Sequence, residues 1–197
     1  MIAWARRRPD WEVGFQDECC WSRVTEPEQQ AWSEKKQALK LRDKTPDLPK
    51  EERKALACYG IWFSQREAMQ LRFVEGRPVS AVTEEFLEWG ATEREQPDKR
   101  ALLLVWDNAS WHVSRRVREW VREHNRQVKR GHKEGVRLVV CPLPSRSPWL
   151  NPIEPKWLHG KRAISEPDAV LDEVELMARV YEHFACPANP LLSTAVA

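Results

Sequence analysis

The stretch ALLLVWD, residues 101–107, is an apolar run that ends in an aspartate. An apolar run of this length predicts a strand that is buried on both faces. Asp107 then lies at the carboxyl end of that strand. Ligands and catalytic groups usually collect in the loops at this end of open α/β sheets. The sequence therefore predicts an α/β fold with a candidate site at Asp107.

A second acidic residue, Glu154, follows a stretch that prolines keep out of regular structure until its last part. We interpret Asn151 as an N-cap and Pro152 as the first helical residue. Glu154 then lies on the first turn of a helix. Taken alone, this pattern also fits a capping box in which Glu154 only bonds back to Asn151.

Residues 106–112, WDNASWH, and 143–157, LPSRSPWLNPIEPKW, resemble two catalytic blocks of DDE transposases. The branch they resemble is the bacterial insertion-sequence group of the mariner superfamily. Its DN-x-x-x-H block carries the second catalytic aspartate, and its S-P-x-L-N-P-I-E-x-x-W block carries the catalytic glutamate. The resemblance therefore assigns these roles to Asp107 and Glu154.

The family also implies a first catalytic aspartate, in a D-E pair on the first strand of a ribonuclease-H-like fold. The segment WEVGFQDECCW, residues 11–21, contains such a pair, and Asp17 is the candidate. Glu18 is its neighbour on the opposite face of the strand. An acidic pair of this kind is otherwise usually a solvated strand end.

The rest of the chain agrees with this fold. Apolar patterning predicts strands at residues 11–21, 55–63, 67–74, 101–106 and 136–141. Helices are predicted at residues 78–89 and 113–130, from Asn151, and after a capping box from Ser165 to Asp168. We expect an α/β, ribonuclease-H-like fold: a mixed five-stranded sheet with helices on both faces.

One domain is expected, from residue 11 to 186. Residues 1–10 are interpreted as a basic tail or linker remnant, and residues 187–197 as a flexible tail. Residues 26–54 are charged and broken by prolines, so we expect a surface loop with at most a short helix around Gln29 to Leu41. The role of this loop is not predicted.

Composition excludes several classes of protein. No apolar run approaches a membrane span, and no signal peptide follows the first residues, so we expect a cytoplasmic, nucleoid-associated bacterial protein. Five cysteines without C-x-x-C spacing argue against a disulfide framework and a zinc ribbon. Among the eleven tryptophans, Trp111, Trp149 and Trp157 flank the acidic blocks and are candidates to touch nucleic acid.

Charge is unevenly distributed along the chain. Residues 111–133 carry eight basic and two acidic side chains, whereas residues 163–197 carry a net charge of −5. A basic stripe beside an acidic site suggests a polyanion held over carboxylates, and the alternative is a solvated helix face. The candidate DNA contacts are Arg115, Arg116, Arg122, Arg146 and Lys156.

Cleavage of a phosphodiester suits two Mg²⁺ ions, with Mn²⁺ as a substitute, held by carboxylates. We expect Asp17 and Asp107 to share one ion and Glu154 to reach the other. His112 matches the family's histidine and either orients the site, contacts phosphate, or has no catalytic duty. Asn108 and Asn151 are accessory candidates that we expect to fix turns rather than bind DNA.

The resemblance implies a transposase catalytic domain that cleaves double-stranded DNA at transposon ends and joins it to target DNA, generally as a homodimer. The chain departs from the family in two ways. It leaves no room for the helix-turn-helix region, so we expect a partial or split transposase with a separately encoded recognition half. Asp107 and Glu154 are also 47 positions apart, longer than usual. The alternatives are an inactive remnant that only binds DNA, and a ribonuclease-H-like nuclease without transposition.

Overall fold

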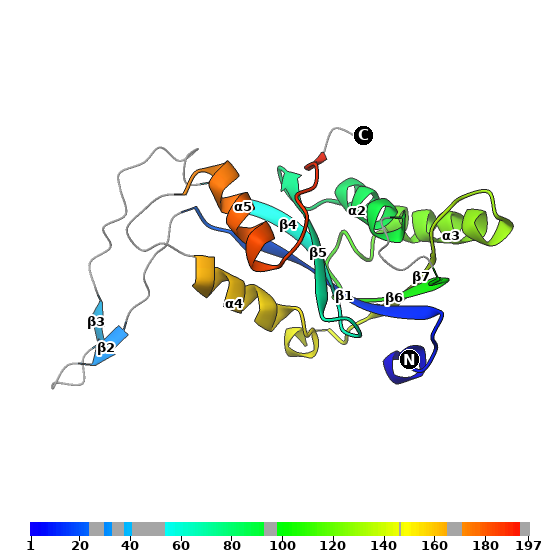
Figure 1. Cartoon of the computed structure of the whole chain (residues 1–197), viewed down its shortest axis with the longest axis horizontal. Helices are drawn as coiled ribbons and strands as arrows, with labels where there is room; N and C mark the ends of the chain where they lie inside the picture. The colour runs from blue at the N-terminus through cyan, green and yellow to red at the C-terminus, as the bar shows by residue number, and fades with distance from the viewer. Residues whose placement is uncertain are drawn as a thin grey trace.

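The computed structural model describes residues 1–23, 30–32, 38–40, 54–92, 98–145, 147–164 and 171–193. Its centre is a six-stranded sheet with the order β7-β6-β1-β4-β5-β8 (Figure 1). The strands are β1 (Trp11–Trp21), β4 (Leu56–Phe63), β5 (Ala68–Glu75), β6 (Ala101–Trp106), β7 (Arg137–Pro142) and β8 (Leu192–Ser193). The helices in the described ranges are α1 (Ile2–Ala5), α2 (Ser80–Thr92), α3 (Arg115–Arg130), α4 (Glu154–Ile164) and α5 (Glu173–His183), with a 3-10 turn η1 (Pro148–Leu150).

The sheet combines an antiparallel and a parallel half. Strands β1, β4 and β5 form the expected antiparallel meander, and β6 and β7 continue the sheet parallel to β1. Phe15 pairs with Val105 in the parallel register of β1 and β6. Asp17 lies two residues after Phe15 on β1, and Asp107 lies two residues after Val105, in the loop that follows β6. The mixed sheet expected from the sequence is therefore confirmed, with one strand more than predicted.

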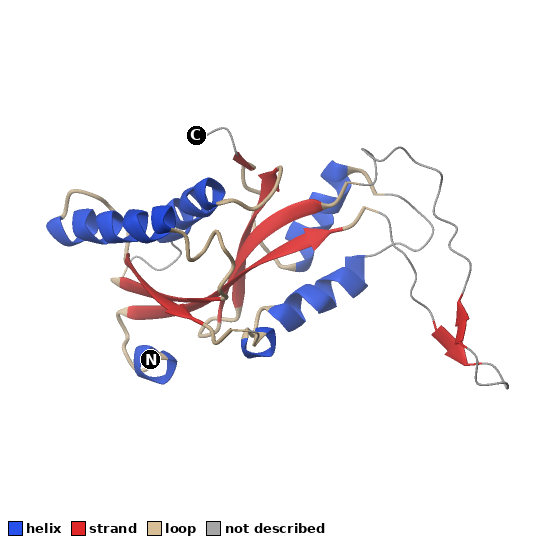
Figure 2. Ribbon diagram, turned by 180° about the vertical axis from the view of Figure 1, so that it is seen from behind, coloured by secondary structure: helices blue, strands red, loops and turns tan. Residues whose placement is uncertain are grey.

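Helices cover both faces of the sheet (Figure 2). One apolar core lies between the sheet and α4 and α5, and contains Val13, Phe15 and Leu103. The other lies under α2 and α3 and contains Leu102 and Leu104. Neighbouring residues of one strand therefore enter opposite cores, as the alternation of side chains along a strand requires. All of β6 is buried, as its continuous apolar run predicts.

Parts of both predicted tails are structured. Residues Ile2–Ala5 form α1, with Ala5 fully buried and Trp4 in edge contact with Trp11. Near the other end, Leu192 is fully buried and β8 pairs with β5. A two-residue strand is too short to leave a period in the sequence, so its place depends on burial of the leucine.

One further prediction differs from the structure, and another falls on residues that the structure does not describe. In place of a helix around Gln29 to Leu41, the described residues form a two-stranded sheet of β2 (Gln30–Trp32) and β3 (Ala38–Lys40). The capping box from Ser165 to Asp168 lies outside the described residues. Helix α5 begins after Asp172, whose side chain accepts the backbone N–H of Glu175.

None of the described helices is long and apolar enough to cross a membrane.

Helix α4 makes a close contact with the sheet at Gly60. Trp157 lies over Gly60 of β4, and a Cβ atom on Gly60 would come within 2.6 Å of the ring atom Cζ2. Gly60 is the register partner of Asp17, and the indole Nε1 of Trp157 donates to Asp17 Oδ2 at 3.2 Å. The missing side chain at residue 60 thus lets a tryptophan reach the aspartate across two strands.

Replacing Gly60 tests this contact. Gly60→Ala should lower the free energy of unfolding by about 1–3 kcal/mol, because the added methyl group overpacks the site and displaces the indole. Urea denaturation measures the loss. In a Trp157→Leu background the same change should cost much less, since the colliding ring is absent. An equal cost in both backgrounds would show that the contact does not seat α4.

Candidate active site

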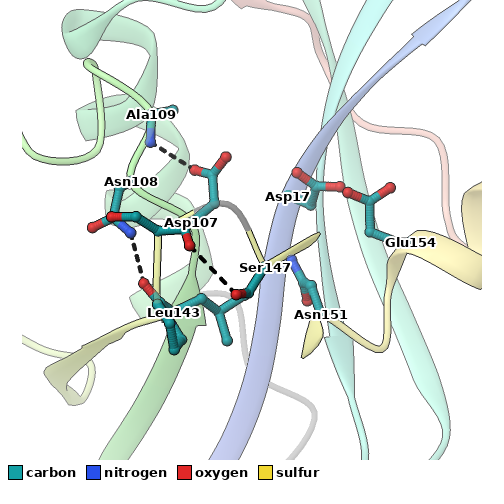
Figure 3. A pocket seen from close by; sticks show the side chains of 10 residues that line it. Asp17, Asp107, Asn108, Ala109, Leu143, Ser147, Asn151 and Glu154 are labelled. Atoms are coloured by element: carbon teal, nitrogen blue, oxygen red, sulfur yellow. Dashed lines mark hydrogen bonds between the residues drawn. The ribbon is translucent and has the colours of Figure 1, made fainter. Parts of the chain in front are cut away.

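The three acidic side chains singled out from the sequence line one cavity of about 490 Å³. Asp17 comes from β1, Asp107 from the loop after β6, and Glu154 from the first residue of α4. Figure 3 shows the carboxylates of Asp17 and Glu154 side by side and that of Asp107 across the cavity. The remaining lining residues are Asn108, Ala109, Leu143, Pro144, Ser145, Ser147 and Asn151.

Among the three acids of the cavity, Asp17 has the pKa that lies furthest from its ordinary value. Burial, followed by the negative charges of Glu154 and Glu18, raises the pKa of its carboxyl to about 8. A proton therefore occupies Asp17 at neutral pH when nothing else compensates the charge. A cation that bound beside Asp17 and Glu154 would take the place of that proton.

The pKa of Asp107 is shifted in the opposite direction to that of Asp17. Its Oδ1 accepts hydrogen bonds from His112 Nδ1 and from the backbone N–H of Ala109, both at 2.8 Å. The bond from His112, assisted by that from Ala109, lowers the pKa of Asp107. The carboxylate is half exposed and stays ionised at neutral pH.

His112 connects Asp107 to Glu18. The ring nitrogen Nε2 lies 2.8 Å from Glu18 Oε1, while Nδ1 faces Asp107. Burial lowers the pKa of His112, but the bonds to Asp107 and Glu18 outweigh it and raise the pKa to about 9. The residue is 1% exposed. Its contact with Asp107 favours the first predicted role, orientation of the site.

The two asparagines tie loops to strands. Asn108 Nδ2 donates to the carbonyl of Leu143 at 2.6 Å and so joins the loop after β6 to the chain after β7. Asn151 Nδ2 donates to the carbonyl of Gln16 of β1 at 3.1 Å. Its buried Oδ1 has no hydrogen-bond partner. Asn151 therefore does not cap α4, and the predicted N-cap is wrong.

This correction also removes the capping-box alternative for Glu154. The backbone N–H of Glu154 bonds to the Asn151 carbonyl, so a turn precedes the helix without a side-chain cap. Among the described residues, the Glu154 carboxylate makes no hydrogen bond. It is an exposed acid at the mouth of the cavity rather than a structural cap.

The predicted DNA contacts are distributed over different surfaces. Arg115, Arg116 and Arg122 lie exposed on α3, where Arg115 bonds to Glu119 at 2.7 Å and Arg116 to Glu84 at 2.9 Å. Lys156 lines a separate cavity, with its Nζ 5.0 Å from the Trp62 ring. Arg146 lies outside the described residues.

The three flanking tryptophans differ in exposure. Trp149 is 75% exposed and offers its ring to solvent, whereas Trp157 is buried in the core under α4. Trp111 is partly buried and donates from Nε1 to Glu18 Oε2 at 3.1 Å. The expectation that Trp157 touches nucleic acid is therefore wrong, because its ring packs beneath the helix.

The cavity suits a hard divalent cation by its donor chemistry. Carboxylate oxygens are preferred by Mg²⁺ and Mn²⁺, and the raised pKa of Asp17 beside Glu154 marks a place where negative charge is in excess. Within the described residues, however, no three acidic, histidine or cysteine side chains form a ready-made metal site. Two carboxylates are adjacent and the third lies across the cavity, so the fit is one of chemistry rather than of assembled geometry.

Glu18 is the member of this site that sequence reasoning treated only as a neighbour of Asp17. Its side chain is 9% exposed and accepts hydrogen bonds from His112, Trp111 and Gln16. The available signal was the alternation of β1, which places Gln16 and Glu18 on one face and Asp17 on the other.

Comparisons with known proteins agree with this fold. A model of the family described as DDE superfamily endonuclease matches residues 12–176. No curated protein matches the chain. Similar solved structures include the Mos1 mariner paired-end complex with Mn, at a TM-score of 0.62 and 16% identity, covering 94% of this chain and 52% of that chain. The Mos1 strand transfer complex has a TM-score of 0.58 and 14% identity, with 94% and 51% coverage.

The chain thus spans about half the length of the Mos1 chains it matches. At these identities the likeness shows the fold, and the mixed sheet with helices on both faces is the ribonuclease-H-like fold of that transposase. The family model spans β1 to α5 and includes all three acidic residues of the cavity. This chain belongs to the DDE superfamily endonucleases.

Proposed function

We propose that this chain is the catalytic domain of a DDE transposase of the bacterial insertion-sequence branch of the mariner superfamily. It cleaves DNA strands at transposon ends and transfers them to target DNA. The observation that carries this proposal is the single cavity that Asp17, Asp107 and Glu154 line from three separate elements. Acids that repel one another gather in this way where a cation holds them.

Asp17, Asp107 and Glu154 are the proposed ligands. Bound Mg²⁺ or Mn²⁺ supplies activation of the attacking oxygen and neutralises charge on the transferring phosphoryl group. Asp17 gives up its proton on loading, and Asp107 is already ionised because His112 and Ala109 bond to it. The attacking groups are water and then a freed 3′ hydroxyl, so the reaction needs no covalent enzyme intermediate.

Double-stranded DNA is the proposed partner, held in part by the exposed basic face of α3. Arg122 is the strongest candidate there, because Glu119 and Glu84 already compensate Arg115 and Arg116. A homodimer and a helix-turn-helix region that recognises transposon ends, in the same or a separately encoded chain, complete the proposal. The Mos1 structures include a paired-end complex with the left transposon end.

Nicking of supercoiled plasmid tests the proposed chemistry. The purified chain should nick DNA in Mn²⁺ or Mg²⁺ but not in EDTA. Asp107→Asn and Glu154→Gln should each lower the rate by at least about 100-fold, since each removes a metal ligand. Glu182→Gln, an exposed acid on α5 outside the cavity, is the control and should retain full activity. Equal nicking by all variants would assign the activity to a contaminant.

Without metal, Asp17→Asn should raise the Tm of the protein, and with metal it should lower the Tm. The folded-state pKa of about 8 lies well above the ordinary value of an aspartate, which the unfolded chain retains, so protonation of Asp17 stabilises the metal-free protein. This contribution is complete below pH 4 and is lost as pH rises through 8. Asp17→Asn remains neutral, so its Tm should exceed that of the wild type increasingly between pH 4 and 8, and the difference should level off above pH 8.

Saturating Mn²⁺ should invert that order, because the wild type gains binding energy that the asparagine variant lacks. Differential scanning fluorimetry with and without EDTA measures both effects. A Tm difference between the two proteins that does not change with pH or with Mn²⁺ would remove Asp17 from the metal site.

The salt dependence of DNA binding tests the assignment of α3. Arg122→Ala should weaken binding to duplex DNA and reduce the slope of log K against log salt by about 1, as expected for one lost phosphate contact. Arg115→Ala should have a smaller effect, because Glu119 already compensates its charge. Fluorescence anisotropy at several salt concentrations distinguishes the two. If neither variant changes the slope, the basic face is only a solvated surface.

A further inference from the structure

We propose that Glu18 is a positioning residue of the active site, which acts through His112 to fix the carboxylate of Asp107 for metal binding. This inference rests on the proposed function and deepens it. Glu18 is not among the residues that line the cavity, because it lies on the opposite face of β1 from Asp17. Any influence on the reacting groups must therefore pass through its neighbours.

The connection from Glu18 to Asp107 is direct. His112 places Nε2 2.8 Å from Glu18 Oε1 and Nδ1 2.8 Å from Asp107 Oδ1. A ring nitrogen bonds to an ionised carboxylate only by donating a hydrogen. Both nitrogens therefore act as donors, and one imidazole ring joins the two carboxylates.

Glu18 is itself held rigidly. Its Oε1 also accepts from Gln16 Nε2 at 2.8 Å, and its Oε2 accepts from Trp111 Nε1 at 3.1 Å. A merely solvated acid at a strand end would be exposed, whereas 9% of this side chain is exposed. Three donors from two segments thus define where the Glu18 carboxylate lies.

The histidine ring is fixed in two ways. It stacks on Trp106 with a centroid distance of 4.6 Å and an interplanar angle of 3°. Stacking restricts the ring to a plane but still allows it to turn within that plane or to flip. The bond to Glu18 removes this freedom and directs Nδ1 toward Asp107.

These contacts make the two carboxylate oxygens of Asp107 different. His112 and the backbone of Ala109 both donate to Oδ1, whereas Oδ2 makes no hydrogen bond in the described part of the chain. The carboxylate therefore presents Oδ2 for a cation in a fixed orientation. Outer partners that orient a metal ligand in this way typically account for about 10–100-fold in metal affinity.

Three variants test the proposal. Glu18→Ala removes the acceptor, and Glu18→Gln keeps one oxygen for His112 Nε2 but loses the charge. Glu12→Gln is the matched control: Glu12 lies on the same strand, is 6% exposed, and bonds to Arg66 at 2.7 Å away from the cavity. Mn²⁺ affinity is measured by calorimetry on the metal-free proteins, and circular dichroism confirms that each is folded.

Glu18→Ala should weaken Mn²⁺ binding about 10–100-fold, and Glu18→Gln should lie between it and the wild type. Glu12→Gln should change Tm without changing Mn²⁺ affinity. In a His112→Ala background, Glu18→Ala should have no additional effect on Mn²⁺ affinity, since its path to Asp107 is already broken. A folded Glu18→Ala variant with wild-type Mn²⁺ affinity would overturn the proposal.

A second readout needs neither metal nor activity. Nitrogen-15 NMR of the histidine side chains should show two protected ring N–H protons on His112 in the wild type. In Glu18→Ala the Nδ1 proton, which faces Asp107, should also lose its protection. An unchanged Nδ1 proton would refute the positioning role even if the wild type neither binds Mn²⁺ nor nicks DNA. Absent nicking with the predicted NMR change would instead refute only the proposed function.

Discussion

The parallel pairing of β1 with β6 is the constraint on which the candidate site depends. It sets Phe15 against Val105, so that Asp17, two residues later on β1, and Asp107, in the loop that follows β6, both come to line the cavity. Neither strand is able to slip by one residue, because each buries side chains in a separate apolar core on both faces of the sheet. The register that closes the cores is thus the same register that places the two aspartates on opposite sides of one cavity.

The cavity concentrates negative charge, and its surroundings shift the pKa values of the two aspartates in opposite directions. Asp17 is buried beside Glu154, so its pKa rises, whereas Asp107 accepts two hydrogen bonds and its pKa falls. Asp17 therefore tends to bind a proton, whereas Asp107 stays ionised. Under the proposed function, a cation bound at the cavity would replace the proton on Asp17, which would couple stability to metal binding.

The two faces of β1 make different contacts at the site. On one face, Asp17 meets Trp157 of α4, which reaches it only because Gly60 carries no side chain. On the other face, Glu18 holds His112 and through it Asp107. The adjacent acids of the D-E pair thus reach the same cavity by opposite routes, one directly and one through an imidazole ring.

The sequence by itself determined the five main strands and the helices α2 and α3, and it singled out Asp17, Asp107 and Glu154 as candidates that line one cavity. These features are visible because burial imposes a period on neighbouring residues and because the acidic blocks are long. It did not determine β8, the role of Asn151 or the burial of Trp157. Those depend on contacts between residues far apart in the chain, such as Asn151 with Gln16 and Trp157 with Gly60. Only the tertiary structure decided the network of Glu18, His112 and Asp107, because hydrogen bonds between separate elements leave no period in the sequence.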